Sequence, residues 1–197
     1  MIVVVGGKND SFHFMDEFKK RFYHEGDPLS YYYNELCGHR YLLDHFEEYR
    51  HEPYLGVEHY RRAFALTPVE IMSLLRENDI IVKAEHGPYG ELSNRDVLGG
   101  CSRYGINYLP LADLWLARWP ELREQADRKT HYGCSMFITT PERFKEMMDE
   151  EFDYIEMMLK SSNLTRASIG YFCETILTPH IIRKHNKKIH VAEVTCA

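Results

Sequence analysis

The sequence predicts an α/β fold, in which a mixed and mostly parallel sheet is covered by helices on both faces. Short apolar segments alternate along the chain with longer segments whose apolar side chains recur every three or four residues. Residues 2–5 are β-branched and end at two glycines, as expected of a buried strand. No internal repeat or low-complexity tract divides the chain. Strands and helices that alternate in an undivided chain are typical of a single α/β domain.

Length and charge limit the classes of partner. At 197 residues the chain suits one domain over residues 1–197, which is either a whole protein or one domain of a longer one. The net charge is −6 and the isoelectric point is about 6.0. Nucleic acids and anionic membranes bind broad basic surfaces. We therefore expect no nucleic acid as a partner.

Cysteine usage and apolar runs indicate the compartment. The five cysteines are an odd number without the spacing of metal ligands, so we expect reduced thiols. Residues 1–6 lack the basic flank and long apolar core of a signal peptide, and no later run is long enough to span a membrane. The sequence therefore predicts a cytoplasmic protein without a membrane span.

The first half of the chain predicts two strands and three helices. Phe14, Phe18 and Phe22 recur at four-residue spacing among charged residues, which predicts an amphipathic helix. Residues 67–70, Thr-Pro-Val-Glu, form a capping box with proline at the first helical position, so a helix should begin there. The expected elements are strands at 2–5 and 54–57 and helices at 11–26, 30–49 and 68–78.

The second half predicts three strands and three helices around one irregular segment. Residues 86–107 are rich in glycine and predict a lid or a substrate wall. Trp115 and Trp119 are assigned to the core, and Pro120 and Pro179 should kink their helices. The expected elements are strands at 79–86, 132–138 and 189–194 and helices at 111–125, 140–152 and 166–186.

One predicted strand ends in a cluster of charged side chains. In open α/β sheets, ligands bind beyond the carboxyl ends of the strands. An acid, an imidazole and two guanidiniums suit a diphosphate, either bare or bound to a metal ion. The alternative is an ordinary solvated turn after a strand. The residues that follow strand 54–57 in this cluster are Glu58, His59, Arg61 and Arg62.

The end of the first strand predicts a contact with a mononucleotide. Gly6 and Gly7 would let the backbone approach a ligand, and Lys8 stands at the same strand exit. The same residues also fit a simple tight turn, because they lack the pattern of a dinucleotide-binding loop.

Asn34 and Glu35 stand among aromatic and apolar residues, where a carboxylate needs a partner. Glu35 pairs either with Arg61 or Arg62, which would orient the site, or with nearby Arg40.

Other polar residues have separate interpretations. Asp79, at the start of a strand, is expected to be structural. Candidates for the acceptor side of a site, in the irregular segment, are His86, Tyr89, Asn94 and Arg95. A basic patch near the end of the last helix either holds a phosphate or is a solvated helix end, and comprises Arg183, Lys184, Lys187 and Lys188.

Four short motifs follow one another along the chain. They are N-E-L at 34–36, G-V-E-H-Y-R-R-A-F at 56–64, M-F-I at 136–138 and R-x-x-x-G-Y-x-x-E at 166–174. In order and spacing they resemble a family of glycosyltransferases from bacterial capsule and exopolysaccharide loci, with relatives that are domains of large algal-virus proteins. The resemblance covers residues 2–185, and H-Y-R-R is its most specific part. It implies a GT-A-like, Rossmann-like domain in the cytoplasm of a bacterium or a virus-infected host cell.

The resemblance also implies a donor site. A nucleotide sugar would lie across the carboxyl ends of the strands, with manganese or magnesium bridging its diphosphate. The usual D-x-D motif is missing, and Glu58-His59-Tyr60 stands in its place. Glu58 and His59 are then the candidate metal ligands, while Arg61 and Arg62 would replace part of the ion's charge.

The implied reaction transfers a hexose or deoxyhexose from a UDP- or dTDP-linked donor to a glycan hydroxyl, in polysaccharide biosynthesis. Arg61 and Arg62 would stabilise the leaving diphosphate. Glu174 would deprotonate or orient the acceptor, or shield an oxocarbenium-like centre. The structural alternative for Glu174 is an ion pair with Arg166.

Two other function classes compete with this interpretation. A metal-dependent phosphoesterase would use the same acid, imidazole and arginines, but it would need more metal ligands than this stretch supplies. A non-catalytic nucleotide-binding module would bind the nucleotide without hydrolysing or transferring the sugar.

Overall fold

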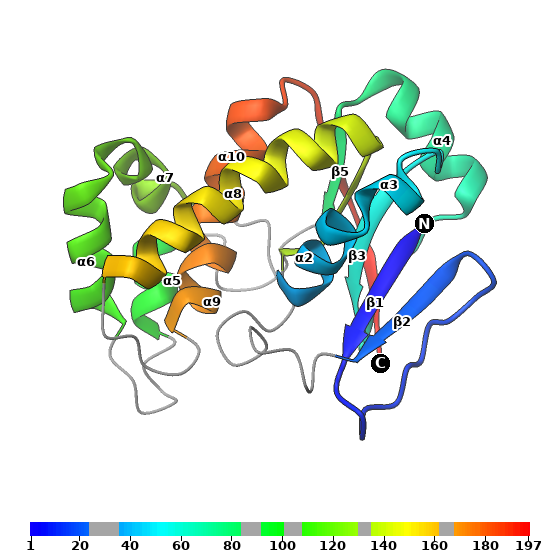
Figure 1. Ribbon diagram of the computed structural model, residues 1–197, viewed down its shortest axis with the longest axis horizontal. Helices are drawn as coiled ribbons and strands as arrows, with labels where there is room; N and C mark the ends of the chain where they lie inside the picture. Colours follow the sequence, from blue (N-terminus) through cyan, green and yellow to red (C-terminus); the bar gives the residue numbers. More distant parts are fainter. Residues whose placement is uncertain (24–35, 84–91, 101–107, 130–134, 162–167) are drawn as a thin grey trace.

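The computed structural model describes residues 1–23, 36–83, 92–100, 108–129, 135–161 and 168–197. These parts form one α/β domain in which helices cover both faces of a mixed sheet, as predicted (Figure 1). Four of the predicted site residues, Asn34, Glu35, His86 and Tyr89, lie outside the described residues.

The central strands run in the order β2-β1-β3-β6-β5-β7. Only β6 among these described strands is antiparallel to its neighbours, so the other five end at the same edge of the sheet. The strands are β1 (Ile2–Gly6), β2 (Lys19–Tyr23), β3 (Leu55–His59), β5 (Ile80–Lys83), β6 (Phe137–Thr139) and β7 (Ile189–Ala192). Two short strands, β4 (Arg62–Phe64) and β8 (Val194–Cys196), pair beside the end of β3.

The alternation of side chains along β1 divides the core into two clusters. Val3 and Val5 belong to the larger cluster, which includes α2 (Leu36–Asp44) and α8 (Pro141–Ser161). Ile2 belongs to the smaller cluster, which includes Ile71 of α4 (Pro68–Glu77). Because both faces of β1 are buried, its sequence is continuously apolar rather than alternating.

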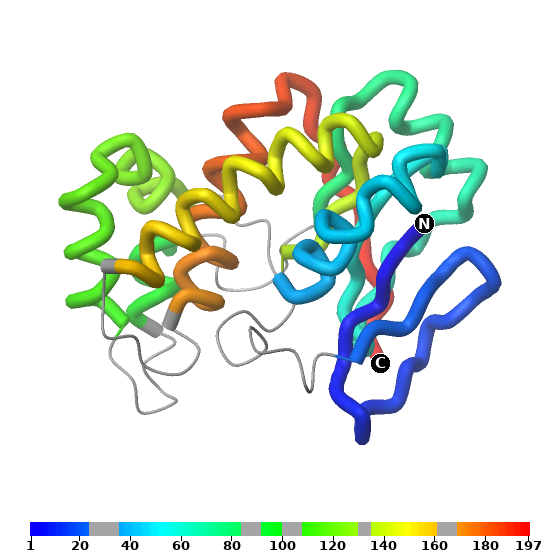
Figure 2. Tube along the Cα trace, in the orientation of Figure 1, coloured from blue at the N-terminus to red at the C-terminus, as the bar shows by residue number. Residues whose placement is uncertain are grey.

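The remaining helices extend the domain away from the sheet. They are α3 (Phe46–Tyr49), α5 (Asn94–Gly100), α6 (Leu109–Arg118), η3 (Pro120–Leu122), α7 (Arg123–Asp127), α9 (Ser168–Phe172), η5 (Cys173–Leu177) and α10 (Thr178–His185). Figure 2 shows α5, α6, α7 and α9 gathered at one side, the sheet at the other, and the long α8 reaching across both.

A glycine permits the close packing of α2 against the sheet. A Cβ atom on Gly38 would lie 2.5 Å from Cγ2 of Val5, well inside van der Waals contact. Any side chain at this position would push the helix away from β1 and β3. The glycine of α2 therefore sets the distance between the helix and the strands that lead to the predicted site.

Several predicted elements are confirmed. The capping box of α4 is present, because Thr67 Oγ1 accepts from the Glu70 N–H at 3.3 Å and Glu70 Oε2 accepts from the Thr67 N–H at 2.7 Å. Trp115 and Trp119 are buried, and the predicted helix 111–125 divides near Pro120, since α6 ends at Arg118 and η3 begins at Pro120. The predicted closing strand is present but divides at Glu193 into β7 and β8.

The predicted helix over residues 11–26 is wrong. Residues 19–23 form the edge strand β2, which lies parallel to β1. Of the three spaced phenylalanines only Phe22 lies in β2, so their spacing does not reflect a helix or a single strand. Lys20 Nζ donates to the Tyr49 hydroxyl at 2.7 Å, and the rings of Phe22 and Tyr41 are 5.0 Å apart. Contacts with α2 and α3, which are distant in sequence, accompany the strand conformation.

Two other expectations need correction. The predicted helix 30–49, where it is described, breaks at His45 into α2 and α3. Residues 94–100, expected to be irregular, form α5. Its start has a local signal, because Ser93 Oγ accepts from the Asp96 N–H at 3.1 Å and Asp96 Oδ2 accepts from the Ser93 N–H at 3.1 Å. This reciprocal cap resembles a capping box.

The irregularity expected at Pro179 takes the form of a π-helical turn, η5, between α9 and α10. Proline has no N–H to donate and its ring crowds the carbonyl four residues earlier, so a wider turn relieves the contact. Thr175 Oγ1 donates to the Tyr171 carbonyl at 2.6 Å. Glu174, a predicted site residue, lies on this turn.

A carboxyl group is buried where α8 packs against η5 and α10. Glu151 is fully buried, and its Oε1 accepts a hydrogen bond from the Thr178 hydroxyl. Burial raises the pKa of Glu151 from 4.5 to about 7, against the opposing effect of this hydrogen bond. The neighbouring Cys173 thiol is also buried, and its pKa is raised by burial and by the charge of Glu151.

Because its pKa is higher in the folded state, Glu151 should make stability fall as pH rises from 4.5 to about 7. Above that window the folded state carries the whole cost of the buried charge. Glu151→Gln keeps the shape and an acceptor for Thr178. Its free energy of unfolding should exceed that of the wild type at about pH 8 by up to about 3 kcal/mol, with little difference near pH 4. Urea titrations at the two pH values measure this difference.

The control is the neighbouring Glu150→Gln. Although burial opposes it, hydrogen bonds from Lys184 and His185 lower the pKa of Glu150. This substitution should therefore lower stability at about pH 8. If Glu151→Gln also lowers stability at pH 8, the Glu151 carboxylate is stabilising and the account of its burial is wrong.

Candidate functional site

The candidate site lies at the edge where the parallel strands end. Gly6, His59 and Lys83 are the last residues of β1, β3 and β5. Val5 pairs with His59 in parallel register, so the ends of β1 and β3 are adjacent. The polar sequence that follows each of these strands is thereby brought to the same edge.

The H-Y-R-R stretch forms a tight hairpin between β3 and β4. His59 pairs with Arg62 across the hairpin, which leaves Tyr60 and Arg61 as the turn. The Tyr60 N–H donates to the Val5 carbonyl at 2.9 Å, and the Arg61 N–H donates to His59 Nδ1 at 3.2 Å. The predicted buried strand is confirmed, but it extends through Glu58 and His59, so of the four predicted site residues only Arg61 and Arg62 follow it. Strand β4 is an addition that the sequence did not indicate.

The hairpin is also tied to the end of the described chain. Arg62 pairs with Cys196 of β8, and the Arg61 carbonyl accepts from the Ala197 N–H at 3.0 Å. The guanidinium of Arg61 lies over the Tyr60 ring, 5.0 Å from its centre. These contacts fix the backbone that carries both arginines.

Glu58 is a structural link beneath this hairpin. Its side chain is 1% exposed, and its Oε2 lies 2.7 Å from Lys19 Nζ. Its Oε1 accepts from the Phe64 N–H at 2.9 Å. Burial raises the pKa of Glu58, while Lys19 and the Phe64 N–H oppose that rise. One carboxylate therefore joins β2, β3 and β4.

Glu58 and His59 do not fit a shared metal ion. Successive side chains of a strand point to opposite faces of the sheet, so these neighbours diverge. Glu58 Oε1 already accepts from the Phe64 N–H, and Oε2 pairs with the Lys19 ammonium. The His59 ring lies tilted beside that of Tyr60, with 4.3 Å between the ring centres. Within the described ranges, no group of three or more His, Cys, Asp or Glu residues is placed to hold a metal ion. The sequence interpretation of these two residues as joint ligands is corrected by the alternation of the strand.

The end of β1 forms a tight turn, the simpler of its two sequence interpretations. The Gly7 N–H donates to Asp10 Oδ2 at 2.6 Å, and the Asp10 N–H donates to the Gly7 carbonyl at 3.0 Å. A Cβ atom on Gly6 would lie 2.9 Å from Cβ of Tyr60, so glycine is needed where β1 meets the hairpin. Lys8 is exposed on this turn.

Aromatic side chains gather beside Gly6, a feature that sequence reasoning missed. The ring of Phe12 meets that of Tyr23 edge-on at 5.4 Å and lies 6.5 Å from that of Tyr60. The guanidinium of Arg21 lies 5.5 Å from the Phe12 ring centre. Phe12 and Tyr23 both lie within residues 11–26, the segment mistaken for a helix, so this cluster could be found only after β2 was recognised.

Two further residues at this edge, Lys83 and Ser135, were not predicted as site residues. Lys83 is 8% exposed although it ends β5, and its position as the last residue of a strand was a usable signal. Ser135 has a φ of 50°, in the left-handed region that non-glycine residues seldom adopt. It lies two residues before Phe137, which pairs with Val57. No local sequence signal marks its conformation.

The predicted acceptor-side residues within the described part have packing contacts. Asn94 is fully buried and its Nδ2 donates to the Gln125 carbonyl at 2.6 Å, so it joins α5 to α7 and is not an acceptor contact. Arg95 pairs with Asp113 of α6 at 2.7 Å. Glu174 is half-buried on η5, which packs against α5 and α7, and its role remains a prediction. Its alternative partner Arg166 lies outside the described residues.

The sheet order and the reversed β6 are consistent with a GT-A-like, Rossmann-type α/β domain. No family model matches the chain, and no curated protein matches its sequence. The solved structure titled "WbbM bifunctional glycosytransferase apo structure" is similar to the whole chain, with a TM-score of 0.62 and 12% sequence identity. The chain spans 45% of the length of that structure. At this identity the similarity establishes the fold alone.

Among the described helices, none combines the length and apolar character needed to cross a membrane.

The Lys19–Glu58 pair predicts a specific stability pattern. Glu58→Leu removes the nearest carboxylate of the Lys19 ammonium, which keeps only Asp16 at 3.8 Å and the Phe14 carbonyl at 3.2 Å, and leaves the Phe64 N–H without its acceptor. Its free energy of unfolding in urea should fall by about 3–5 kcal/mol. The double variant Lys19→Met/Glu58→Leu removes both charges and should recover most of this loss, because apolar replacement of a buried pair is often neutral.

The matched control is Glu47→Leu, which removes an exposed partner of Arg50 and should change stability by less than about 1 kcal/mol. Equal losses in the single and double Glu58 variants would show that the ion pair is not what holds the hairpin.

Proposed function

We propose that the chain is a glycosyltransferase domain that transfers a hexose or deoxyhexose from a UDP- or dTDP-linked donor to a glycan hydroxyl. The observation that carries this proposal is the β3–β4 hairpin, which places Arg61 and Arg62 beside the glycine end of β1. In open α/β sheets this edge is where nucleotides bind. The likeness of fold to a structure whose title names a glycosyltransferase adds support.

The chemistry of the leaving group explains why cations belong at this edge. As the glycosidic bond breaks, the diphosphate gains negative charge, so fixed positive groups stabilise the transition state more than the ground state. The hairpin backbone is held by Val5, His59 and Ala197, which limits reorganisation during the reaction. Guanidinium groups also match phosphate oxygens with paired hydrogen bonds.

A divalent ion is implied by the resemblance, but Glu58 and His59 do not fit one. We therefore assign the diphosphate to the cations of this edge rather than to an ion on that pair. Arg61 and Arg62 come from the hairpin, Lys8 from the turn after β1 and Lys83 from the end of β5. In this assignment Glu58 acts indirectly, because it anchors β4 through Phe64.

The aromatic cluster supports a nucleoside rather than a bare pyrophosphate. Tyr23 is 43% exposed and lies edge-on to Phe12, beside the turn that follows β1. Aromatic faces stack on nucleobases with little dependence on the base. A base placed there would leave its diphosphate near the glycine turn and the arginine hairpin.

The proposal predicts that uridine or thymidine diphosphate at millimolar concentration raises the melting temperature, because a ligand bound only to the native state stabilises it. Arg61→Ala and Arg62→Ala should each weaken binding roughly tenfold to hundredfold, the effect of losing a charged hydrogen bond. Arg118→Ala, which removes an arginine of α6 that lies over Trp119, is the control and should bind as the wild type does. Thermal shifts and calorimetric titrations give both quantities.

The outcomes separate the proposal from its competitors. Equal affinity in all three variants would make the hairpin an ordinary surface turn. A shift that appears only when manganese is added would contradict the assignment of the diphosphate to arginines. The absence of any shift with either nucleotide would remove the transferase proposal at its first step.

Glu174 is proposed to act on the acceptor or the sugar. Glu174→Gln keeps the size of the side chain but removes its charge and its basicity, so turnover should fall by at least about a hundredfold. Nucleotide affinity and melting temperature should remain close to the wild type. Glu146→Gln, on the exposed side of α8, is the matched control and should change neither turnover nor stability.

A Glu174→Gln variant that melts early but keeps its turnover at low temperature would assign Glu174 to packing. If the wild type binds nucleotide yet shows neither transfer nor donor hydrolysis, the chain is a binding module rather than an enzyme.

A further inference from the structure

A polar cavity lies at the edge of the sheet opposite to the candidate site, where β5 and β7 begin and β6 ends. Its volume is about 560 Å³. The residues that line it are Leu75, Arg76, Glu77, Asn78, Asp79, Thr140, Arg143, His185, Lys187 and Lys188. They come from the end of α4, the start of α8 and the turn between α10 and β7.

Asp79 holds the lysine-bearing wall of this cavity in place. Its Oδ2 accepts from the backbone N–H groups of Lys187 at 2.8 Å and Lys188 at 3.0 Å. Although burial opposes it, these N–H groups and Arg143 lower the pKa of Asp79, which stays ionised. The prediction that Asp79 is structural is thereby confirmed.

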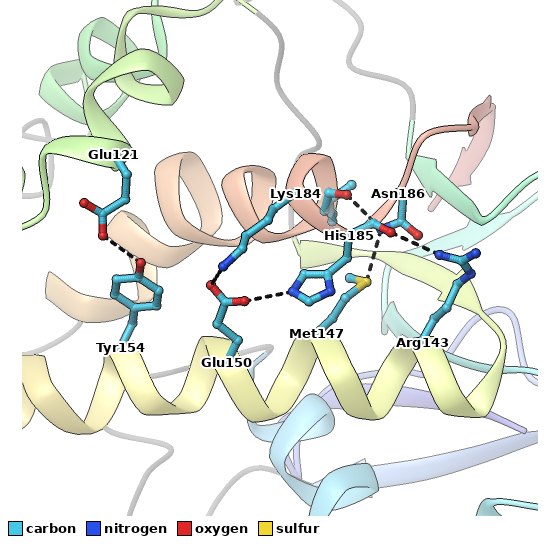
Figure 3. Close-up of polar contacts among 9 residues, drawn as sticks. Glu121, Arg143, Met147, Glu150, Tyr154, Lys184, His185 and Asn186 are labelled. Atoms are coloured by element: carbon cyan, nitrogen blue, oxygen red, sulfur yellow. Dashed lines mark hydrogen bonds and ion pairs between the residues drawn. The ribbon is translucent and has the colours of Figure 1, made fainter.

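Arg143 completes this support from the start of α8. It pairs with Asp79 Oδ1 at 2.9 Å and donates to the His185 carbonyl at 3.0 Å. Figure 3 shows Arg143 reaching from α8 to that carbonyl, while the His185 ring turns toward Glu150, 2.8 Å away. The Lys187–Lys188 turn is therefore fixed from two sides.

The charge of the cavity is opposite in sign to that of the chain. Four of its ten lining residues are arginine or lysine and two are acidic, whereas the whole chain carries −6. The carboxylate of Asp79 is already engaged by Arg143 and by backbone donors. Within the described chain, Arg76, Lys187 and Lys188 form no ion pair, and Glu77 is the remaining acid.

We propose that this cavity binds a phosphate group carried by an ester. The ammonium group of a lysine is a compact positive charge that can bind phosphate from several directions. Arg76 adds the paired N–H donors of a guanidinium group to the lining of the cavity. Thr140, which also lines the cavity, directly precedes the long helix α8. The amino end of a helix carries a partial positive charge, which favours an anion. The bound group is either the headgroup of an anionic lipid or a soluble phosphate ester.

The inference goes beyond the proposed function and does not depend on it. The arginine hairpin lies at the carboxyl ends of the strands, whereas the cavity lies at their amino ends. A ligand in the cavity therefore does not occupy the position proposed for the donor.

The test uses the full chain and two double variants of equal charge change. Lys187→Glu/Lys188→Glu alters the cavity and leaves the backbone donors to Asp79 in place. Lys129→Glu/Lys160→Glu is the control, because both lysines are exposed and neither lines the cavity. Soluble binding is measured by calorimetric titration with glycerol phosphate. Lipid binding is measured by sedimentation with phosphatidylcholine vesicles that contain phosphatidylglycerol or lack it.

The wild type and the control should bind one of these probes, and the cavity variant should bind it at least tenfold more weakly. Binding of glycerol phosphate, with or without binding to the vesicles, points to a soluble ester, and binding only to phosphatidylglycerol vesicles points to a lipid headgroup. Equal weakening in the two double variants, or no binding of either probe by the wild type, overturns the proposal.

A third variant tests whether the loss of binding is due to misfolding of the double variant. Arg76→Gln removes one facing cation on α4 without reversing a charge, and it should weaken binding of the same probe severalfold. Titration with uridine diphosphate should be unchanged in every cavity variant. A failure of nucleotide binding in the wild type would count against the proposed function and not against the cavity.

Discussion

The buried contact between Glu58 and Lys19 is the constraint on which the candidate site depends. It joins the edge strand β2 to β3, and the second oxygen of the same carboxylate binds the backbone of β4. The arginine hairpin lies between these two attachments. Glu58, which the sequence suggested as a metal ligand, thus holds the hairpin that carries Arg61 and Arg62 at the edge of the sheet. Two donors oppose the effect of burying the Glu58 charge, but burial is the larger influence and raises its pKa.

The sequence predicted the elements whose signals are local. Strand β1 has a continuous β-branched run, and α4 has its capping box and proline in four consecutive residues. Strand β2 was missed because its conformation depends on contacts with Tyr41 and Tyr49, which are distant in sequence. The local spacing of phenylalanines carries no information about these contacts. Helix α5 was missed although Ser93 and Asp96 provided a local cap.

The candidate site was predictable in position but not in detail. The end of β3 could be predicted from residues 55–62, because the sequence there changes abruptly from apolar to charged residues. The separate directions of Glu58 and His59 follow from strand alternation and could have been inferred. The pairing of Glu58 with Lys19 could not, because it depends on the register of a strand that the sequence did not reveal.

The central claim is that a nucleoside diphosphate binds at the carboxyl edge, between the β1 turn and the arginine hairpin. The most direct measurement is a titration of uridine diphosphate followed by the backbone amide signals of the isotope-labelled chain. The account predicts that the signals of Gly7, Lys8 and Arg61 shift together with one saturation curve. Shifts confined to Lys187 and Lys188, at the opposite edge of the sheet, would contradict it.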